Sequence, residues 1–491
     1  MKHLFECRTV VLMGLFILML CLTNLTGWSR DIIVAQDGSG EFTTIQAGID
    51  AAASGDVIII QSGEYTEDLA IGTLNVPPAR KDNITVRAAE GAEVTVIPAN
   101  TGDRLKSLEA VGADFGDQDL MGFLVNGENV VIEGIHLRQE STAINANDIN
   151  SLMLVVSSNV TVRNCHFTGT GADTSGDVLG LAITPLDIMA LQQGGGIATN
   201  LTVEDCTFTG FPFALVNSNF PKTLSDVFAG VPSPVVTARN CSFTENENGV
   251  EIDDGETNII NCTFSENQTG IHTSSGAGDT NIINCVISEN LQHGIEIDDQ
   301  NDFVTPGSPV VKVEGCRIER NGLNAGEYGI LMETGTLNLS RTIFWENSDA
   351  QLFLDTEPFG PTTAVIDHCD LVETFLGGGG IIIADQTDNQ INLTVTNSII
   401  IEDAFAIVVN GDPANSNVTL RNNTIVADVS QVEGEADVQE NILDVDPMYV
   451  DAANGNFYLQ SGSPVLTAGI DGTFLGSLGS EDSSVDTWMV H

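Results

Sequence analysis

A repeat runs through most of this chain and limits the folds that it can adopt. The segment 257–262 (TNIINC) recurs at 280–285, 23 residues later. Aligned on its cysteine, one register position is occupied by Ile135, Cys165, Cys206, Cys241, Cys262, Cys285, Cys316, Thr342, Cys369, Ser398 and Asn423. The seven steps from Cys241 to Asn423 average 26 residues, and a large apolar residue follows each anchor two positions later. A period in the twenties with short alternating strands is typical of a solenoid.

The residue pattern within each repeat predicts a parallel β-helix. Equivalent residues of successive coils would stack about 4.8 Å apart. The anchor and the residue two positions later lie on one face of a strand, so both should point inward. We therefore predict an all-β, single-stranded right-handed parallel β-helix in which the cysteines form a buried column of small spacers. Catalytic or disulfide roles for these cysteines are the less favoured alternatives.

Asparagine marks a second register position, five residues after the anchor. It is found in five successive repeats, at Asn246, Asn267, Asn290, Asn321 and Asn347. Asparagine tolerates left-handed backbone angles and can bond its own turn, so we expect this column to fix one corner of every coil. A second strand then follows, visible as GVEI (249–252), GIHT (270–273), GIEI (294–297) and GILM (329–332).

Four regions follow from this reading. Residues 1–29 have the pattern of a signal peptide, with an uncleaved membrane anchor as the alternative. Residues 30–54 would form an N-terminal cap, with Thr43 and Gln46 as a capping box on a helix of about ten residues. Residues 55–445 would be the β-helix, with long insertions at about 100–122, 138–156, 168–198 and 209–234. We expect the apolar pieces of these insertions to pack together as one side structure, and residues 446–491 to form an irregular closing segment.

The charge of the chain excludes some partners. The sequence has 68 Asp and Glu against 17 Lys and Arg, a formal net charge of −51. Such a field repels nucleic acid and anionic membranes. Solubility in a saline medium and a cation-binding face are both compatible with it. The cysteines form no C-x-x-C pair and no zinc-like spacing with histidine.

Two segments resemble a known superfamily. Residues 35–65 look like the opening of pectin-lyase-like proteins, and the pattern Asp446-Pro447, Asn456-Phe457, Leu459, Ser463-Pro464 resembles the ends of bacterial secreted right-handed β-helix proteins. The resemblance implies a right-handed β-helix and action on polysaccharides. The catalytic signatures of pectin methylesterases, polygalacturonases and alginate epimerases are absent from the sequence, so the catalytic residues stay unknown.

Acidic residues follow the second strand at matching positions in three successive repeats. They are Asp298, Asp299, Glu333 and Asp355. Carboxylates on neighbouring coils repel unless they are separated, protonated or bridged by a cation. Because calcium takes six to eight oxygen ligands, these four residues are a candidate calcium site. Acid/base hydrolysis of glycosides by a carboxylate pair and simple solvated turns remain open alternatives.

Three further residues are candidates for substrate binding. Tyr328 and Trp345 lie in adjacent repeats at outward positions, where their rings could stack on a sugar, and Lys312 alternates outward from Val311 and Val313. His272 and His293 lie nearby and are interpreted as turn or surface residues.

We expect an exported protein, secreted, periplasmic or on the cell surface, that binds extracellular polysaccharide. Cleavage of pectate-lyase or glycosidase type is left open, and calcium is the one candidate cofactor. The alternative is a non-catalytic surface or adhesion-type β-helix that contacts other macromolecules. We expect a monomer with no nucleic-acid partner and no membrane span once the leader is removed.

Overall fold

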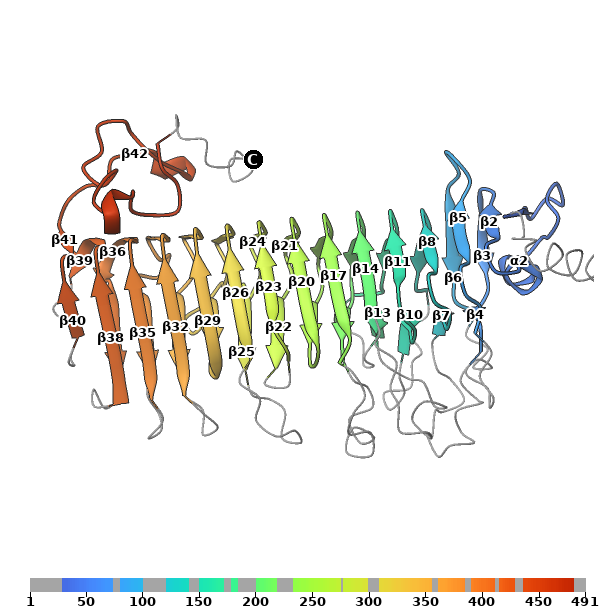
Figure 1. The fold of residues 1–491 in the computed structure, drawn as a ribbon, viewed down its shortest axis with the longest axis horizontal. Coiled ribbons are helices and arrows are strands. Elements are labelled where there is room, and N and C mark those ends of the chain that lie inside the picture. Colours follow the sequence, from blue (N-terminus) through green and yellow to red (C-terminus); the bar gives the residue numbers. More distant parts are fainter. Residues whose placement is uncertain are drawn as a thin grey trace, which may run out of the picture.

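The chain folds into a solenoid of three long parallel sheets, as the computed structural model in Figure 1 shows. The structure describes residues 29–73, 80–99, 121–140, 150–171, 178–183, 200–218, 233–274, 277–298, 309–355, 361–384, 390–410, 415–428 and 436–480. The predicted signal peptide lies outside these residues, apart from its last position. Each complete coil contributes one short strand to each sheet, in the order sheet A, sheet B, sheet C. The predicted β-helix is confirmed.

Sheet A has 15 strands and includes the first described strand of the chain, upstream of the predicted start of the solenoid at residue 55. Its strands are β1 (Asp31–Val34), β2 (Val57–Ile60), β5 (Thr85–Ala88), β8 (Val131–Glu133), β11 (Val160–Arg163), β14 (Asn200–Glu204), β17 (Val235–Arg239), β20 (Glu256–Ile260), β23 (Thr280–Ile283), β26 (Val310–Glu314), β29 (Gly335–Ser340), β32 (Thr362–Asp367), β35 (Ile391–Thr396), β38 (Ser416–Arg421) and β40 (Ala436–Gln439).

Sheet B has 14 strands, most of them three residues long. They are β3 (Gly63–Thr66), β6 (Val94–Ile97), β9 (His136–Arg138), β12 (His166–Thr168), β15 (Thr207–Thr209), β18 (Ser242–Thr244), β21 (Thr263–Ser265), β24 (Val286–Ser288), β27 (Arg317–Glu319), β30 (Ile343–Trp345), β33 (Asp370–Val372), β36 (Ile399–Phe405), β39 (Thr424–Asp428) and β41 (Ile442–Leu443).

Sheet C has 12 strands. They are β4 (Leu69–Ile71), β7 (Met121–Val125), β10 (Asn150–Val155), β13 (Val178–Ile183), β16 (Phe213–Asn217), β19 (Asn248–Ile252), β22 (Thr269–Ser274), β25 (Ile295–Asp298), β28 (Tyr328–Met332), β31 (Ala350–Asp355), β34 (Gly379–Ala384) and β37 (Ile407–Asn410). Strands β10, β13 and β16 fall within ranges that the sequence assigned to insertions. Their apolar residues therefore belong to the solenoid wall instead of a side structure.

The anchor column lies in the solenoid interior, as predicted. All seven cysteines of the described chain are buried and free of disulfides. Along the column, the backbone N–H of one anchor donates to the side chain of the next, as from Cys241 to the Cys262 Sγ at 3.4 Å. The same contact continues through Ser398 to Asn423 and then Asn441, which adds one member to the column. Small anchors thus satisfy polar backbone groups that a larger apolar residue would leave unpaired.

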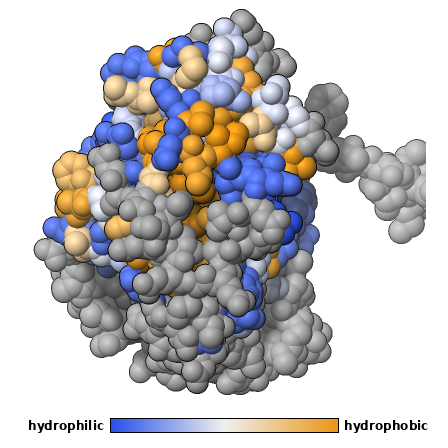
Figure 2. All heavy atoms as spheres, turned by 90° about the vertical axis from the view of Figure 1, so that its left-hand side faces the viewer, coloured by the Kyte–Doolittle hydropathy of each residue, from blue (hydrophilic) through white to orange (hydrophobic). Residues whose placement is uncertain are grey.

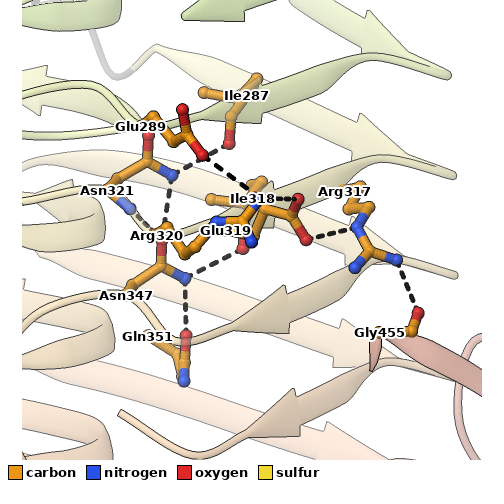
Figure 3. Close-up of polar contacts among 10 residues, drawn as sticks. All are labelled: Ile287, Glu289, Arg317, Ile318, Glu319, Arg320, Asn321, Asn347, Gln351 and Gly455. Carbon is orange, nitrogen blue, oxygen red and sulfur yellow. Dashed lines mark hydrogen bonds and ion pairs between the residues drawn. The ribbon is translucent and has the colours of Figure 1, made fainter. Parts of the chain in front are cut away.

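The asparagine column forms an inward ladder and does not adopt the left-handed conformation that the sequence suggested. The left-handed residues are those just before each asparagine, such as Glu245, Glu266 and Arg320. The asparagine side chains point into the corner and bond the next coil: the Asn321 Nδ2 donates to the Asn347 Oδ1 at 2.9 Å (Figure 3). The residue before each asparagine therefore turns the chain, and the asparagine itself joins its coil to the next one.

One helix covers the start of the solenoid. Helix α2 (Ile45–Ala51) has seven residues, is capped by Thr44 instead of Thr43, and packs on the first strands of sheets A and C. The Glu67 carboxylate accepts from the N–H groups of Ile45 and Gln46, which takes the place of the predicted capping box. This α-helix, the one in the described part of the chain, is far shorter than a membrane-spanning helix.

The C-terminal segment, residues 446–480, folds back along the outside of sheet B. It contains the antiparallel pair β42 (Tyr449–Asp451) and β43 (Asn456–Leu459), and Figure 1 shows it beside the last coils. Its apolar side chains pack on Ile343, Trp345, Val372 and Ile399 of sheet B. Figure 2 looks onto the end that carries β40 and β41, where apolar surface remains visible, and Leu443 of this last coil is 48% exposed. The segment therefore covers the side of the solenoid.

Candidate functional site on sheet C

The structure does not bring the three predicted substrate-binding residues together. Lys312 lies on β26 of sheet A, where its ammonium pairs with Glu314. Tyr328 begins β28 of sheet C, and Trp345 ends β30 of sheet B. Because the three sheets face different directions around the solenoid, these side chains do not share one surface.

Trp345 is an attachment point for the C-terminal segment. It is 8% exposed, and the Phe457 ring meets its ring edge-on with centroids 5.8 Å apart. The guanidinium carbons of Arg317 and Arg320 lie 5.3 and 5.4 Å from its ring centroid. Arg317 in turn donates to the Gly455 carbonyl at 2.9 Å (Figure 3). Little of the indole face is left for a sugar.

The predicted calcium residues partly share a position in the sheet. Asp298, Glu333 and Asp355 follow one another in the parallel register of β25, β28 and β31, whereas Asp299 lies outside the described residues. Asp298 and Asp355 are buried, with exposed fractions of 1% and 5%. Within the described ranges, no group of three or more His, Cys, Asp or Glu is arranged to hold a metal ion. Calcium binding thus stays a prediction.

A buried histidine lies between two carboxylates on the outward face of sheet C. His272, on β22, has its Nδ1 2.8 Å from the Glu251 Oε1 and its Nε2 3.1 Å from the Asp298 Oδ1. Glu251 is held from the side by the Asn248 Nδ2 at 2.7 Å. Since a carboxylate only accepts hydrogen bonds, both ring nitrogens donate and the ring is an imidazolium. Glu251, His272, Glu296 and Asp298 are called the acid–histidine cluster below.

The protonation of the cluster follows from burial and from its own charges. Burial alone would lower the pKa of His272, but the Glu251 and Asp298 carboxylates raise it well above its ordinary value. Burial raises the pKa of Glu296; the carboxylates of Asp298 and Glu251 add to that shift, and the His272 charge opposes it. Three carboxyl groups therefore surround one cation, and burial favours the protonated form of Glu296.

Aromatic rings continue this face toward the C-terminus. The Tyr328 ring lies parallel to the His293 ring, with centroids 5.6 Å apart, and to the Phe353 ring at 4.4 Å. Burial lowers the pKa of His293 to about 4, and its Nδ1 accepts from the Tyr328 backbone N–H at 3.1 Å, so the ring is neutral. Leu331 and Ile382 pack around these rings. His293, Tyr328 and Phe353 are called the aromatic column.

The interpretation as turn or surface residues is wrong for His272, which is buried in a strand. His293 does lie in the turn between β24 and β25, where it is half-buried, stacked against Tyr328 and bonded to its backbone. The signal that could have placed the first cluster was present in the repeat. Glu251, His272 and Glu296 are the third residues of GVEI, GIHT and GIEI, and alternation from the inward second and fourth residues sends all three outward.

The arrangement can bind a polar ring compound. The acid–histidine cluster supplies hydrogen-bond acceptors, and the adjacent aromatic column supplies apolar ring edges, since His293 and Phe353 cover the two faces of the Tyr328 ring and leave that residue 8% exposed. His272 does not act as a base while both nitrogens donate. None of the 12 sheet C strands contains Lys or Arg, so the His272 imidazolium, held between two carboxylates, is the one cation that these strands carry.

Comparison with known proteins concerns the fold. Residues 225–364 match the family described as "Right handed beta helix region". No relative was found among curated protein sequences. A pectate lyase is similar at 13% identity and a TM-score of 0.37, over 93% of this chain and 98% of that one.

Two other solved structures are similar at the same level. A rhamnogalacturonan lyase has 12% identity and a TM-score of 0.37, over 86% of this chain and 91% of its own. The periplasmic alginate epimerase AlgG has 10% identity and a TM-score of 0.36, over 79% and 76%. At these TM-scores the likeness carries no argument of its own. The three parallel sheets and the family match over residues 225–364 show that the chain is a right-handed parallel β-helix.

Proposed function

We propose that the outward face of sheet C, from β19 to β31, binds an extracellular polysaccharide. The observation that supports this most is the direct succession of the acid–histidine cluster and the aromatic column along five parallel strands. A polysaccharide extends over several sugar rings, and a solenoid presents its side chains in a row of matching length. Export is part of the proposal, since it follows from the leader pattern of the sequence.

The charge of the face favours a neutral glycan. Glu251, Glu296 and Asp298 surround a single imidazolium, so an acidic uronan would meet unbalanced negative charge. Acidic glycans would bind through a bridging cation, for which Asp298, Glu333 and Asp355 are the candidate ligands. In the absence of calcium the proposed ligand is therefore a neutral glycan. In the presence of calcium the face should bind a uronan as well.

A panel of neutral and uronic polysaccharides tests the proposal. Affinity electrophoresis with and without calcium should show retardation by at least one of them. The variant Tyr328→Ala should lose this retardation, and Tyr328→Phe should keep it because the ring is retained. Retention of binding by Tyr328→Ala would contradict the assignment of this face. Ultraviolet absorbance of unsaturated products and reducing-end assays on the same panel detect cleavage.

A non-catalytic contact surface is the second candidate function. The turns between sheets B and C expose apolar side chains in nearby coils, with Leu323 at 65% and Phe375 at 74% exposure. Exposed apolar side chains gathered in one region mark sites of macromolecular contact. The variant Phe375→Ala separates the two candidates, because it should leave glycan binding unchanged and weaken any contact made by this edge.

A further inference from the structure

The outward face of sheet B carries a two-column array of hydroxyl groups in five successive coils. Its strands read HFT (β12), TFT (β15), SFT (β18), TFS (β21) and VIS (β24). The middle residue of each points inward, and the first and third point outward. Eight of the ten outward residues are Thr or Ser, and His166 and Val286 are the other two. These ten residues, half-buried or exposed, are called the hydroxyl face.

The array is regular along the solenoid. The five strands pair in parallel without a register shift, so each column runs straight from coil to coil. Beneath them, the rings of Phe167, Phe208, Phe243 and Phe264 are stacked with centroids 4.6, 5.0 and 4.8 Å apart. The two columns are about 6.6 Å apart, twice the rise per residue of a strand. The hydroxyls therefore repeat in two directions.

The inward rings beneath the face keep one orientation from coil to coil. Neighbouring phenyl planes differ by 9°, 5° and 4° along β12, β15, β18 and β21, so these four strands carry their inward side chains in the same way. Each phenyl ring lies between the two outward positions of its strand and is buried. A close-packed interior of this kind holds the strands above it in fixed positions.

The hydroxyl face is free of charged side chains. The general preference of β-strands for threonine does not explain this absence of charge. Threonine is also found at outward positions of sheet A in the same coils, at Thr161, Thr202 and Thr237. Two residues further along those strands, however, sheet A has Arg163, Glu204 and Arg239. No Asp, Glu, Lys or Arg lies at the ten outward positions of sheet B, in a chain of net charge −51.

The hydroxyls retain bonding capacity toward a ligand. The Thr209 and Thr244 Oγ1 atoms are 3.0 Å apart, and His166 Nδ1 lies 2.8 Å from the Thr207 Oγ1. A hydroxyl donates one hydrogen bond and accepts two, so groups paired in this way still bind water. No aromatic ring faces outward from these strands except His166, so stacking on a sugar is not what this face provides.

We propose that the hydroxyl face adsorbs to ice. An ice surface is a flat, uncharged lattice of water molecules that donate and accept hydrogen bonds, and it excludes ions. Holding a water at a fixed position costs up to about 2 kcal/mol, and water in ice is already fixed. A rigid array of hydroxyl and methyl groups therefore matches such a surface. A mobile charged side chain would instead bind a hydration shell whose water molecules are not arranged as they are in ice. This activity is separate from glycan binding on sheet C.

Inhibition of ice recrystallisation by the full mature chain tests the proposal. Wild-type protein should keep ice grains small, and a fluorescently labelled sample should coat an ice crystal. The variant Thr244→Lys places one charge at the centre of the face and should lose both effects. Its matched control is Thr237→Lys, which adds the same charge in the same coil, on sheet A, and should keep both.

Circular dichroism first establishes that the variants are folded, and each of the following outcomes then supports or overturns ice binding by the hydroxyl face. Absence of both effects in the wild-type protein overturns the proposal. Retention by Thr244→Lys, or equal loss in both variants, overturns the assignment to this face. Co-sedimentation with crystalline cellulose, abolished by Thr244→Lys and unaccompanied by any effect on ice, would assign the face to a solid polysaccharide instead.

Discussion

Single asparagines join the coils of this protein by more contacts than a turn residue normally makes. The Asn267 side chain is fully buried and makes four hydrogen bonds. Its Oδ1 accepts from the backbone N–H and the Nδ2 of Asn246, and its Nδ2 donates to the Phe243 carbonyl and the Asn290 Oδ1. Removing it takes a hydrogen bond from polar groups of three other residues in a place that water does not reach, although the Asn290 Oδ1 keeps the bond that it accepts from the backbone N–H of residue 267.

We expect Asn267→Ala to lower the free energy of unfolding by about 3 kcal/mol, because each unsatisfied buried group costs about 1–3 kcal/mol. That is close to the cost of about 3–5 kcal/mol expected for Phe264→Ala, which removes a stacked ring. Asn281→Ala is the control, because the Asn281 Nδ2 donates to the Asn258 Oδ1 on the half-buried outer face of sheet A. This variant should lower the free energy of unfolding by no more than about 0.5 kcal/mol. Equal denaturation midpoints for the two asparagine variants would contradict this account.

A glutamate ends the asparagine ladder. The Asn347 Nδ2 donates to the Gln351 Oε1, and the Gln351 Nε2 lies 3.5 Å from the Glu402 Oε1. Burial raises the pKa of Glu402 from 4.5 to about 7, although Thr374 donates two hydrogen bonds to the carboxylate. Between these pH values the folded chain holds a proton that the unfolded chain has released. The stability that this group contributes is therefore complete below the lower value and is lost as pH rises through about 7.

Glu402→Gln should abolish that part of the pH dependence. Denaturant unfolding on both sides of pH 7 should show the wild type losing up to about 3 kcal/mol more than the variant as pH rises. Titration of His272 also lowers stability at higher pH, but it is common to both proteins and cancels in the difference. Glu373→Gln, at the exposed turn beside Thr374, removes a charge that adds to the pKa shift of Glu402 and should keep most of the wild-type pH dependence, because burial is the largest cause of that shift. A parallel pH profile for Glu402→Gln would mean that Glu402 is ionised in the folded protein throughout.

At the scale of strands, sheet C combines acidic residues in neighbouring coils with no Lys or Arg in its 12 strands. The successive register of Asp298, Glu333 and Asp355 is the part of the predicted calcium site that the described residues contain. We expect calcium to raise the melting temperature at constant ionic strength, since binding to the folded state adds about 2.7 kcal/mol at a hundredfold excess over the dissociation constant. Constant ionic strength matters because salt screening alone stabilises a highly charged chain.

Asp355→Asn tests this register without touching the acid–histidine cluster. The variant should lose the calcium response and keep its melting temperature in the absence of calcium. Glu314→Gln, which removes one acid from sheet A, should respond as wild type. An unchanged response in Asp355→Asn would place any calcium elsewhere on the molecule.

For the whole molecule, the sequence predicted what repeats and missed what depends on distant contacts. The cysteine column and the large residues beside it recur in every coil, so their inward position followed from alternation alone. The acid–histidine cluster occurs once: the repeat register aligns Glu251, His272 and Glu296, but its fourth residue, Asp298, was assigned to the calcium candidates because it lies two positions further along its strand than Glu296. The C-terminal segment lacks the repeat, and its contact with sheet B joins residues as far apart as Asp370 and Ser477.

The C-terminal segment is held on the solenoid by an apolar patch and by hydrogen bonds, several of them to one buried carboxylate, and this predicts a separate unfolding step. Asp370 is buried, which raises its pKa to about 6, and it accepts from the Tyr449 hydroxyl at 2.6 Å and from the Ser477 N–H at 2.7 Å. Tyr449→Phe removes one of these donors, and a hydrogen bond to a charged group contributes about 1.5–3 kcal/mol. We expect this variant to release the segment at lower denaturant than wild type while the coils remain folded. The fluorescence of Trp345, which the segment covers, should shift to longer wavelength in that first step, and circular dichroism should change later.

Tyr328→Phe, the same change on sheet C, is the control and should leave the denaturant midpoint of the first step unchanged. A single transition seen by both signals in Tyr449→Phe would show that the segment and the solenoid unfold as one unit.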